Sequence, residues 1–167
     1  MIIDAPIFIV LASNTVGGAE VNLVKIAKMY PKRCILLTSE EHGDLSLYCK
    51  QLDLPIYHLK TNVTRLKVFN FIKLFLTFKP SIVYSVGIYN CFTLRFLKIF
   101  LKYKLIVGVR SNYSSNKFSH FIFRVIEKYF SFLVDYYITN CQESSKSLSC
   151  LCNIRKSKIE IIYNYII

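Results

Sequence analysis

The sequence is poor in glycine, proline and acidic residues, and it contains no tryptophan. Its 5 Gly and 4 Pro among 167 residues exclude collagen-like and Pro/Gly-rich low-complexity chains. Only 10 Asp and Glu oppose 22 Lys and Arg, so the formal net charge is +12. Because 53% of the residues are hydrophobic and 19% are charged, disorder is excluded, and the length suits one domain with its own core. A chain this basic and apolar indicates an anionic partner, either nucleic acid or a membrane surface.

The sequence also lacks a hydrophobic run that could span a membrane. The two longest charge-free stretches are Ala5–Ala19 and Pro80–Leu94; both contain Ser, Asn and Gly, and both fall short of about 18 apolar residues. A signal peptide is not indicated, because Met1–Ile3 carries no Lys or Arg and Asp4 has the wrong charge. We therefore expect a cytoplasmic protein, with peripheral attachment to the inner face of the cell membrane as a further option.

Motifs for metal ions and nucleotide cofactors are missing as well. The six cysteines include no C-x-x-C pair and no matching pair of histidines, so we expect no metal site and interpret the cysteines as reduced thiols. Neither G-x-G-x-x-G nor G-x-x-x-x-G-K-[ST] occurs, which excludes the dinucleotide-binding and P-loop fingerprints.

What the sequence does contain is an alternation of short apolar runs with longer helical segments. The strands are expected at Ile7–Leu11, Arg33–Thr38, Ile56–His58, Ile82–Ser85, Leu105–Val109, Tyr136–Thr139 and Ile159–Ile162. The helices are expected at Ala19–Met29, Leu45–Leu52, Leu66–Phe78, Asn90–Leu101, Phe118–Leu133 and Glu143–Cys150. Near-continuous apolar strands are typical of a sheet that is buried on both faces. The sequence therefore predicts a single Rossmann-like α/β domain over residues 1–167, in three layers around a mainly parallel sheet of about seven strands.

Polar segments follow the predicted strands at one edge of this sheet. They are Ser13–Gly18, Ser39–Asp44, Ser85–Tyr89, Arg110–Asn116 and Asn140–Ser144. The segments that precede the strands are plain connectors. Because open α/β sheets bind ligands outside the carboxyl ends of their strands, we expect any functional site at this edge.

The sharpest motif is Gly17-Gly18-Ala19-Glu20, between the first strand and the first helix. Two glycines let the backbone approach a ligand closely, and the helix that follows presents free N–H groups and a partial positive charge. This chemistry suits a diphosphate or a carboxylate. A tight turn that merely starts a helix explains the same residues equally well.

Four ordered segments resemble retaining glycosyltransferases of family 4, which have the GT-B fold. Gly17-Gly18-Ala19-Glu20, with Leu23, Ile26 and Ala27 behind it, resembles the family's amino-terminal signature. The later segments are Lys79–Ser85, similar to K-P-D-I-V-H, Ile138–Ser144, similar to N-S-E/x-x-S, and Lys158–Asn164, similar to K-I-x-V-I-Y-N-G. The resemblance spans nearly the whole chain, although Tyr165 stands where the family usually has glycine.

The resemblance implies roles for particular residues. Gly17, Gly18 and Arg110 would be catalytic: the glycines would face the donor's diphosphate, and the Arg110 guanidinium would hold a phosphate. Substrate binding is implied for four residues: Glu20, Asn112, Asn140 and Ser144. Considered without the resemblance, Arg110 could form an ordinary surface salt bridge, and Asn140 and Ser144 could cap a helix.

The resemblance further implies that the chain is the amino-terminal, acceptor-binding half of a glycosyltransferase. The full enzyme would move a hexose-type sugar from a nucleotide-diphosphate sugar to a glycan or polyprenyl-linked acceptor, in cell-surface polysaccharide synthesis. No D-x-D occurs, and such enzymes need no metal or other cofactor beyond the donor substrate. The family's carboxyl-terminal donor-binding domain, with its E-x-x-x-x-x-x-E pair, is not among these residues. The alternative is a non-catalytic, membrane-associated adaptor that pairs with a separate donor-binding chain.

One predicted helix also suggests a membrane contact. Arg95, Lys98 and Lys102 are spaced i, i+3 and i+7, which puts them along one face beside large apolar residues. This pattern suits an anionic membrane surface, and it equally fits a core-facing helix with a solvated cationic side. Nucleic-acid binding is disfavoured, because most aromatic residues fall within helices of nearly all-apolar character.

Overall fold

A computed structural model of the protein describes residues 5–163, apart from residues 12, 39–42, 60–63, 87 and 111–117. Within these ranges the strands are β1 (Ile7–Val10), β2 (Cys34–Thr38), β3 (Ile56–His58), β4 (Ile82–Val86), β5 (Lys104–Val109), β6 (Tyr136–Thr139) and β7 (Ile159–Ile161). The α-helices are α1 (Gly18–Met29), α2 (Asp44–Gln51), α3 (Thr64–Phe78), α4 (Ile88–Phe100), α5 (Phe118–Phe130) and α6 (Gln142–Leu151). Two 3₁₀ turns are η1 (Ser131–Leu133) and η2 (Lys156–Lys158).

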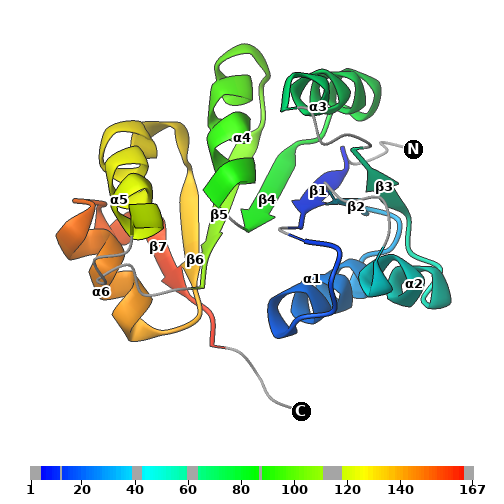
Figure 1. The fold of residues 1–167 in the computed structure, drawn as a ribbon, viewed down its shortest axis with the longest axis horizontal. Helices are drawn as coiled ribbons and strands as arrows, with labels where there is room; N and C mark the ends of the chain where they lie inside the picture. The colour runs from blue at the N-terminus through cyan, green and yellow to red at the C-terminus, as the bar shows by residue number, and fades with distance from the viewer. Residues whose placement is uncertain are drawn as a thin grey trace.

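The described strands form one parallel sheet in the order β3-β2-β1-β4-β5-β6-β7 (Figure 1). The predicted Rossmann-like fold is therefore confirmed. The strand order changes direction between β1 and β4, which are hydrogen-bonded neighbours, and open α/β sheets bind ligands at the carboxyl ends of the strands beside such a point. One helix is shorter than predicted, because α5 ends at Phe130 and the chain continues as η1.

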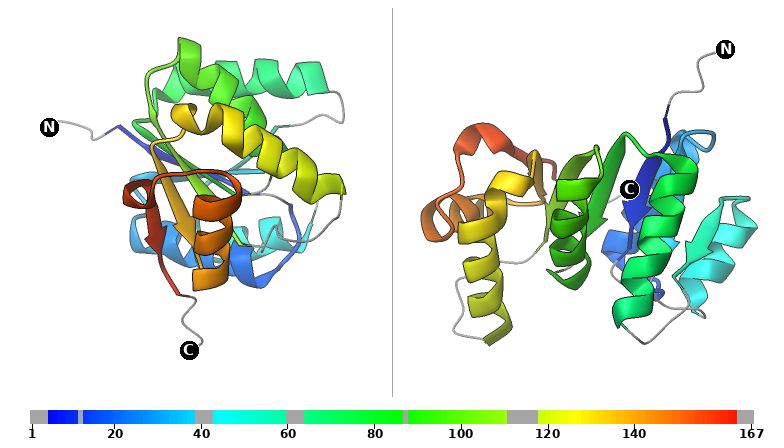
Figure 2. Two further views of the ribbon diagram at one scale, coloured as in Figure 1. Left: turned by 90° about the vertical axis from the view of Figure 1, so that its left-hand side faces the viewer. Right: turned by 90° about the horizontal axis from the view of Figure 1, so that it is seen from above.

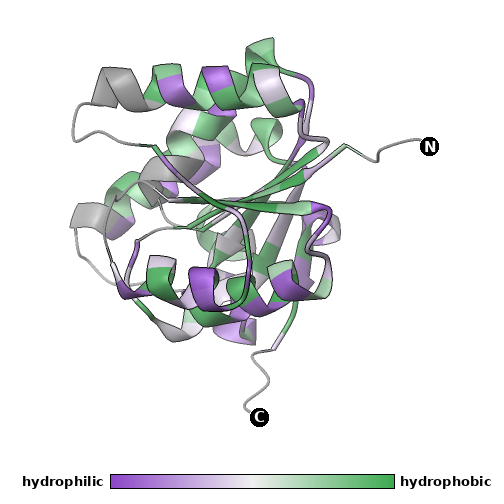
Figure 3. Cartoon of the chain, turned by 90° about the vertical axis from the view of Figure 1, so that its right-hand side faces the viewer, coloured by the Kyte–Doolittle hydropathy of each residue, from purple (hydrophilic) through white to green (hydrophobic). Residues whose placement is uncertain are grey.

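Alternate residues of the five central strands β2, β1, β4, β5 and β6 enter two separate cores. In β1, Phe8 faces one core and Ile9 faces the other, as the period of two in a strand requires. The first core lies under α3, α4, α5 and α6, and the second lies under α1 and α2. Figure 2 shows the arrangement of these helices around the sheet, and Figure 3 shows hydrophobic strands between helices that alternate in hydropathy.

An aromatic cluster fixes α3 on the sheet. Phe75 of α3 is 3% exposed, and its ring contacts Phe8 edge to face with centroids 5.2 Å apart. The same ring lies 4.9 Å from the Tyr103 ring and 6.4 Å from the Phe71 ring. Aromatic pairs at such distances add to the stabilisation that burial alone provides. Phe75 therefore joins α3 to both β1 and the segment that enters β5.

No helix in the described ranges has both the length and the hydrophobicity that crossing a bilayer requires.

Candidate functional site

A pocket of about 250 Å³ lies beside α1 on the face of the sheet that carries α1 and α2. Because these two helices stand at the β1–β3 end of the sheet, they leave the β5–β7 part of this face open (Figure 1). One wall of the pocket is a single stripe of α1, formed by Asn22, Lys25 and Ile26 at i, i+3 and i+4. The remaining lining comes from four other places: Tyr84 of β4, Arg110 after β5, Ile138–Asn140 at the end of β6, and Ile162 and Tyr163 after β7.

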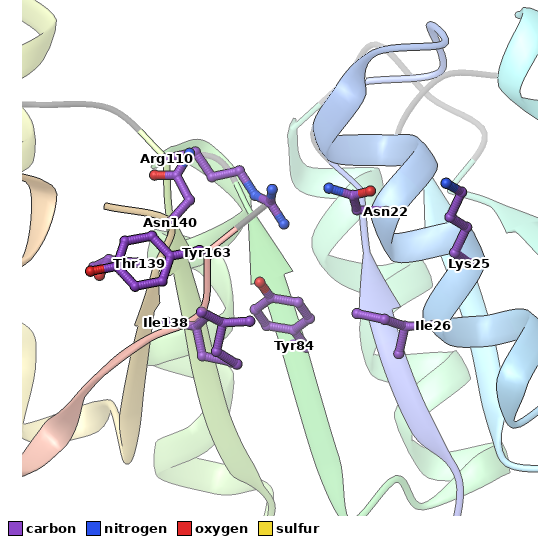
Figure 4. A pocket seen from close by; sticks show the side chains of 10 residues that line it. Asn22, Lys25, Ile26, Tyr84, Arg110, Ile138, Thr139, Asn140 and Tyr163 are labelled. Carbon is purple, nitrogen blue, oxygen red and sulfur yellow. The ribbon is translucent and has the colours of Figure 1, made fainter. Parts of the chain in front are cut away.

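Polar groups lie on both walls of the pocket. In Figure 4 the Arg110 guanidinium extends over Tyr84 toward Asn22 of α1. The Asn140 Oδ1 atom is buried and has no hydrogen-bond partner among the described residues. Buried polar atoms are normally satisfied, so this oxygen has capacity to accept a hydrogen bond, although in Figure 4 it points away from Tyr84 and Asn22. The lining is largely apolar, and its charged residues, Arg110 and Lys25, are both cations with no Asp or Glu among the described lining residues, so the pocket suits a ligand that carries an anionic group beside an apolar part.

The shape of the pocket depends on a glycine in β5. A Cβ atom on Gly108 would lie 2.8 Å from the Tyr84 hydroxyl oxygen and 2.8 Å from Val86 Cγ2. Cβ atoms in proteins essentially never lie this close to another heavy atom. A residue larger than glycine at position 108 would therefore displace the Tyr84 ring or the Val86 side chain.

We therefore expect Gly108→Ala to lower the free energy of unfolding by about 1–3 kcal/mol, because the added methyl group must displace Tyr84 or Val86. Urea denaturation followed by circular dichroism measures this change. The double variant Gly108→Ala/Tyr84→Phe should recover part of the loss, since it removes the hydroxyl oxygen. Gly18→Ala is the matched control, because a Cβ there meets nothing within 4 Å. Equal losses in the two glycine variants would contradict this explanation.

The predicted glycine motif lies at the start of α1 and does not line the pocket. Gly17 is the N-cap of the helix in extended conformation, with φ −117° and ψ 164°, and Gly18 is exposed. The Glu20 carboxylate folds back over this turn, because a Cβ on Gly17 would lie 2.6 Å from Glu20 Oε2. A carboxylate in the first turn stabilises a helix N-terminus. Glu20 is therefore placed at the turn rather than in the pocket, and the catalytic roles of Gly17 and Gly18 stay predictions.

The other predicted binding residues are placed differently from one another. Arg110 and Asn140 both line the pocket, as the carboxyl-edge argument predicts. Ser144 is fully buried in α6, where its hydroxyl oxygen lies 3.2 Å from Cys141 Sγ. Because the side chain is buried, it does not reach a substrate at the surface in this structure. The N-cap of α6 is Cys141, so neither Asn140 nor Ser144 is the capping residue. Asn112 lies outside the described residues.

Two of the three residues of the predicted basic stripe on α4 and its exit are paired with carboxylates of the fold, and one of these two, Arg95, is buried. Arg95 is 1% exposed and forms an ion pair with buried Glu127 of α5, with Nη2 and Oε1 2.5 Å apart. Lys98 is partly buried and donates a hydrogen bond to Asp135. Only Lys102 of the three is exposed. Helical spacing aligned these cations correctly, but the aligned side faces α5 and the segment that leads into β6.

Tyr84 and the α1 stripe were not predicted as site residues from the sequence. A signal for Tyr84 was present, since it is one of only two residues with a hydroxyl group, with Ser85, in a strand that is otherwise apolar. Asn22 is also polar in a helix whose buried residues are Leu23, Val24 and Ala27. Among the described residues no three His, Cys, Asp or Glu side chains gather as a metal site needs.

No protein-family model and no curated protein sequence matches the chain. Solved structures do match its fold. Anabaena Alr3699/HepE in complex with UDP superposes with a TM-score of 0.77 and 18% identity, over 96% of this chain and 44% of that chain. The structure of HepE with UDP-glucose superposes with a TM-score of 0.77 and 17% identity, again over 96% of this chain and 44% of that chain.

Two further structures extend this comparison. A glycosyltransferase from Rickettsia africae matches with a TM-score of 0.71 and 12% identity, over 96% of this chain and 43% of that chain. UDP-GlcNAc 2-epimerase from Neisseria meningitidis, bound to UDP-GlcNAc, matches with a TM-score of 0.64 and 14% identity. The match covers 93% of this chain and 46% of the epimerase chain. The chain thus has the Rossmann-like fold of one half of GT-B proteins, and it spans less than half the length of these neighbours. Because an epimerase shares the fold, the fold alone does not determine the reaction.

Proposed function

We propose that this chain is the amino-terminal, acceptor-binding half of a family 4-like GT-B glycosyltransferase. The complete enzyme transfers a hexose-type sugar from a nucleotide-diphosphate sugar to a glycan or polyprenyl-linked acceptor in cell-surface polysaccharide synthesis. The observation that carries the proposal is the pocket at the carboxyl edge, which Arg110 and Asn140 both line. The UDP and UDP-glucose complexes of a structural neighbour support it, because they are complexes of the same fold with a nucleotide sugar.

In this proposal the polar groups of the pocket bind a sugar phosphate. Arg110 binds phosphate oxygens, and the side-chain amides of Asn22 and Asn140 form hydrogen bonds with the ligand from the two walls. The turn at Gly17 and Gly18 can present N–H groups of the α1 N-terminus to the diphosphate only when the Glu20 carboxylate moves away from it. Fixed N–H groups and cations stabilise the charge that grows on a leaving diphosphate, and this electrostatic term is usually large.

A titration of the ¹⁵N-labelled chain with UDP and with pyrophosphate tests this proposal. We expect the backbone amide signals of Gly17, Gly18 and Arg110 to shift, and Arg110→Ala to weaken binding about tenfold through loss of a charged hydrogen bond. The control is Lys32→Ala, an exposed cation at the opposite edge of the sheet. The chain alone should turn over little nucleotide sugar, because the donor-binding half contributes most of the donor contacts.

Three results would contradict the proposal. They are rapid turnover of a nucleotide sugar by the 167-residue chain, signals that shift only away from the carboxyl edge, and equal binding by Arg110→Ala and the native chain.

The second candidate is a non-catalytic, membrane-associated adaptor that pairs with a separate donor-binding chain. It is favoured by the exposed apolar side chains beside the pocket, Ile26, Ile162 and Tyr163, which a second chain could cover. Kinetics with the donor-binding half supplied separately distinguish the two candidates. Arg110→Ala lowers turnover if this chain is an enzyme half, and it leaves turnover unchanged if the chain is an adaptor.

A further inference from the structure

Tyr84 of β4 lies between the two walls of the pocket, and its side chain leans toward the carboxyl edge of the sheet (Figure 4). In the β4–β5 ladder Tyr84 is paired with Ile106, whereas Gly108 is paired with Val86. The Tyr84 hydroxyl oxygen nevertheless lies 2.8 Å from the place that a Cβ atom on Gly108 would take. It therefore reaches about 6–7 Å further toward the carboxyl ends than its own ladder position, since each strand residue rises about 3.3 Å.

Arg110 stands at the end of the same row of β5 residues. Alternate residues of a strand share a face, so Ile106, Gly108 and, two residues further, Arg110 lie on one side of the sheet. On that side Gly108 places no side chain between Tyr84 and Ile138, which is the β6 partner of Gly108. In Figure 4 the Tyr84 hydroxyl group points toward the end of the pocket where the Arg110 guanidinium lies. A ligand at this point therefore meets a hydroxyl group and a guanidinium group together.

The surroundings of these two polar groups are mostly apolar. Tyr84 is 9% exposed and packs in the second core. The pocket lining also includes Ile26, Ile138 and Ile162. A ligand group that enters here leaves water, so its oxygen atoms need hydrogen-bond donors from the protein. The guanidinium group offers a planar fork of N–H donors, and the tyrosine hydroxyl group offers one O–H donor. The pocket thus suits an anionic group with more than two oxygen atoms.

We propose that Tyr84 is a specificity-determining residue, whose hydroxyl group makes the pocket select phosphate esters over carboxylates. This role rests on the proposed function, because it requires that the pocket binds the anionic part of a ligand. The guanidinium fork of Arg110 donates two parallel hydrogen bonds, which match two oxygen atoms of either anion. A carboxylate is planar and has no further oxygen. A phosphate is tetrahedral, so one of its remaining oxygen atoms projects from the plane of the fork and accepts a third hydrogen bond from the Tyr84 hydroxyl group.

Titrations of the ¹⁵N-labelled chain with phenyl phosphate and with benzoate test this role, because the two ligands share an apolar ring and differ in the anionic group. We expect Tyr84→Phe to weaken the binding of phenyl phosphate about tenfold, through loss of one charged hydrogen bond, and to change the binding of benzoate less than about twofold. Arg110→Ala should weaken the binding of both ligands. Each variant is compared with the native chain for the same ligand, so the different net charges of the two ligands do not affect the comparison.

Tyr30→Phe is the matched control, because Tyr30 is an exposed tyrosine at the opposite end of α1. The dispersion of the amide signals verifies that each variant is folded. The role of Tyr84 is overturned if Tyr84→Phe weakens both ligands equally or neither, if Tyr30→Phe has the same effect, or if the native chain does not bind phenyl phosphate at the pocket. Failure of the proposed function is a different result, namely that UDP does not bind at the carboxyl edge. A chain that binds UDP there without the selective loss in Tyr84→Phe contradicts only the role of Tyr84.

Discussion

Replacement of Arg95 by methionine is expected to lower the free energy of unfolding by about 3–5 kcal/mol, because it leaves a buried carboxylate without its counter-charge. Arg95 Nη2 donates a hydrogen bond to Glu127 Oε1, and the Tyr137 hydroxyl donates one to Glu127 Oε2, each at 2.5 Å. The three side chains come from α4, α5 and β6, and none is more than 1% exposed. Urea denaturation at pH 8 measures the loss.

The pH dependence of this variant provides a second readout. Burial raises the pKa of Glu127, and the Arg95 charge together with hydrogen bonds from Tyr137 and Arg95 opposes that rise. In Arg95→Met the Arg95 charge and its hydrogen bond no longer lower the pKa of Glu127. The folded-state pKa of Glu127 therefore moves further above the unfolded value. A carboxyl group shifted in this direction stabilises the fold at low pH and loses that contribution as pH rises through its folded pKa. Arg95→Met should therefore be less destabilised at pH 5 than at pH 8.

Two control variants separate the ion pair from general damage to α4. Arg95→Met/Glu127→Leu removes both charges, and it should recover most of the stability, since apolar replacement of a buried pair is often neutral. Lys98→Met breaks a partly exposed pair on the same helix and should cost less than about 1 kcal/mol. An Arg95→Met variant as stable as the native chain at pH 8 would show that the pair is not needed.

Phe75→Ala is expected to cost about 3–5 kcal/mol, because it leaves a cavity at the centre of the aromatic cluster. Its ring contacts Phe8, Phe71 and Tyr103, so the cavity would open among side chains of α3, β1 and the entry to β5. Thermal and urea denaturation give the change in free energy. We expect Phe75→Leu to cost less than Phe75→Ala, since leucine fills part of the same volume.

The control for this variant lies on the same helix. Phe69 is 65% exposed, so Phe69→Ala should change the free energy of unfolding by no more than about 0.5 kcal/mol. A large loss in Phe69→Ala, or a small one in Phe75→Ala, would mean that α3 is not fixed on the sheet through Phe75.

The carboxyl-edge part of the candidate site was predictable from sequence, and the α1 wall was not. Arg110 and Asn140 follow two buried strands, and parallel strands bring their carboxyl ends to one edge. Asn22 and Tyr84 join them only because α1 stands at the β1–β3 end of the sheet and leaves the rest of that face open. Gly108 contributes through a missing side chain, which no spacing pattern in the sequence reveals.

By itself, the amino-acid sequence determined the order of strands and helices and the parallel sheet, because runs of apolar residues must be buried between two helical layers. It also determined the excess of positive charge. Only the tertiary structure decided which of those charges reach the surface. Helical spacing brings Arg95 and Lys98 to one side of α4, but whether that side meets solvent or a carboxylate depends on Glu127 and Asp135, more than thirty residues further along the chain. A buried cation requires such a partner, and only folding brings the partner near.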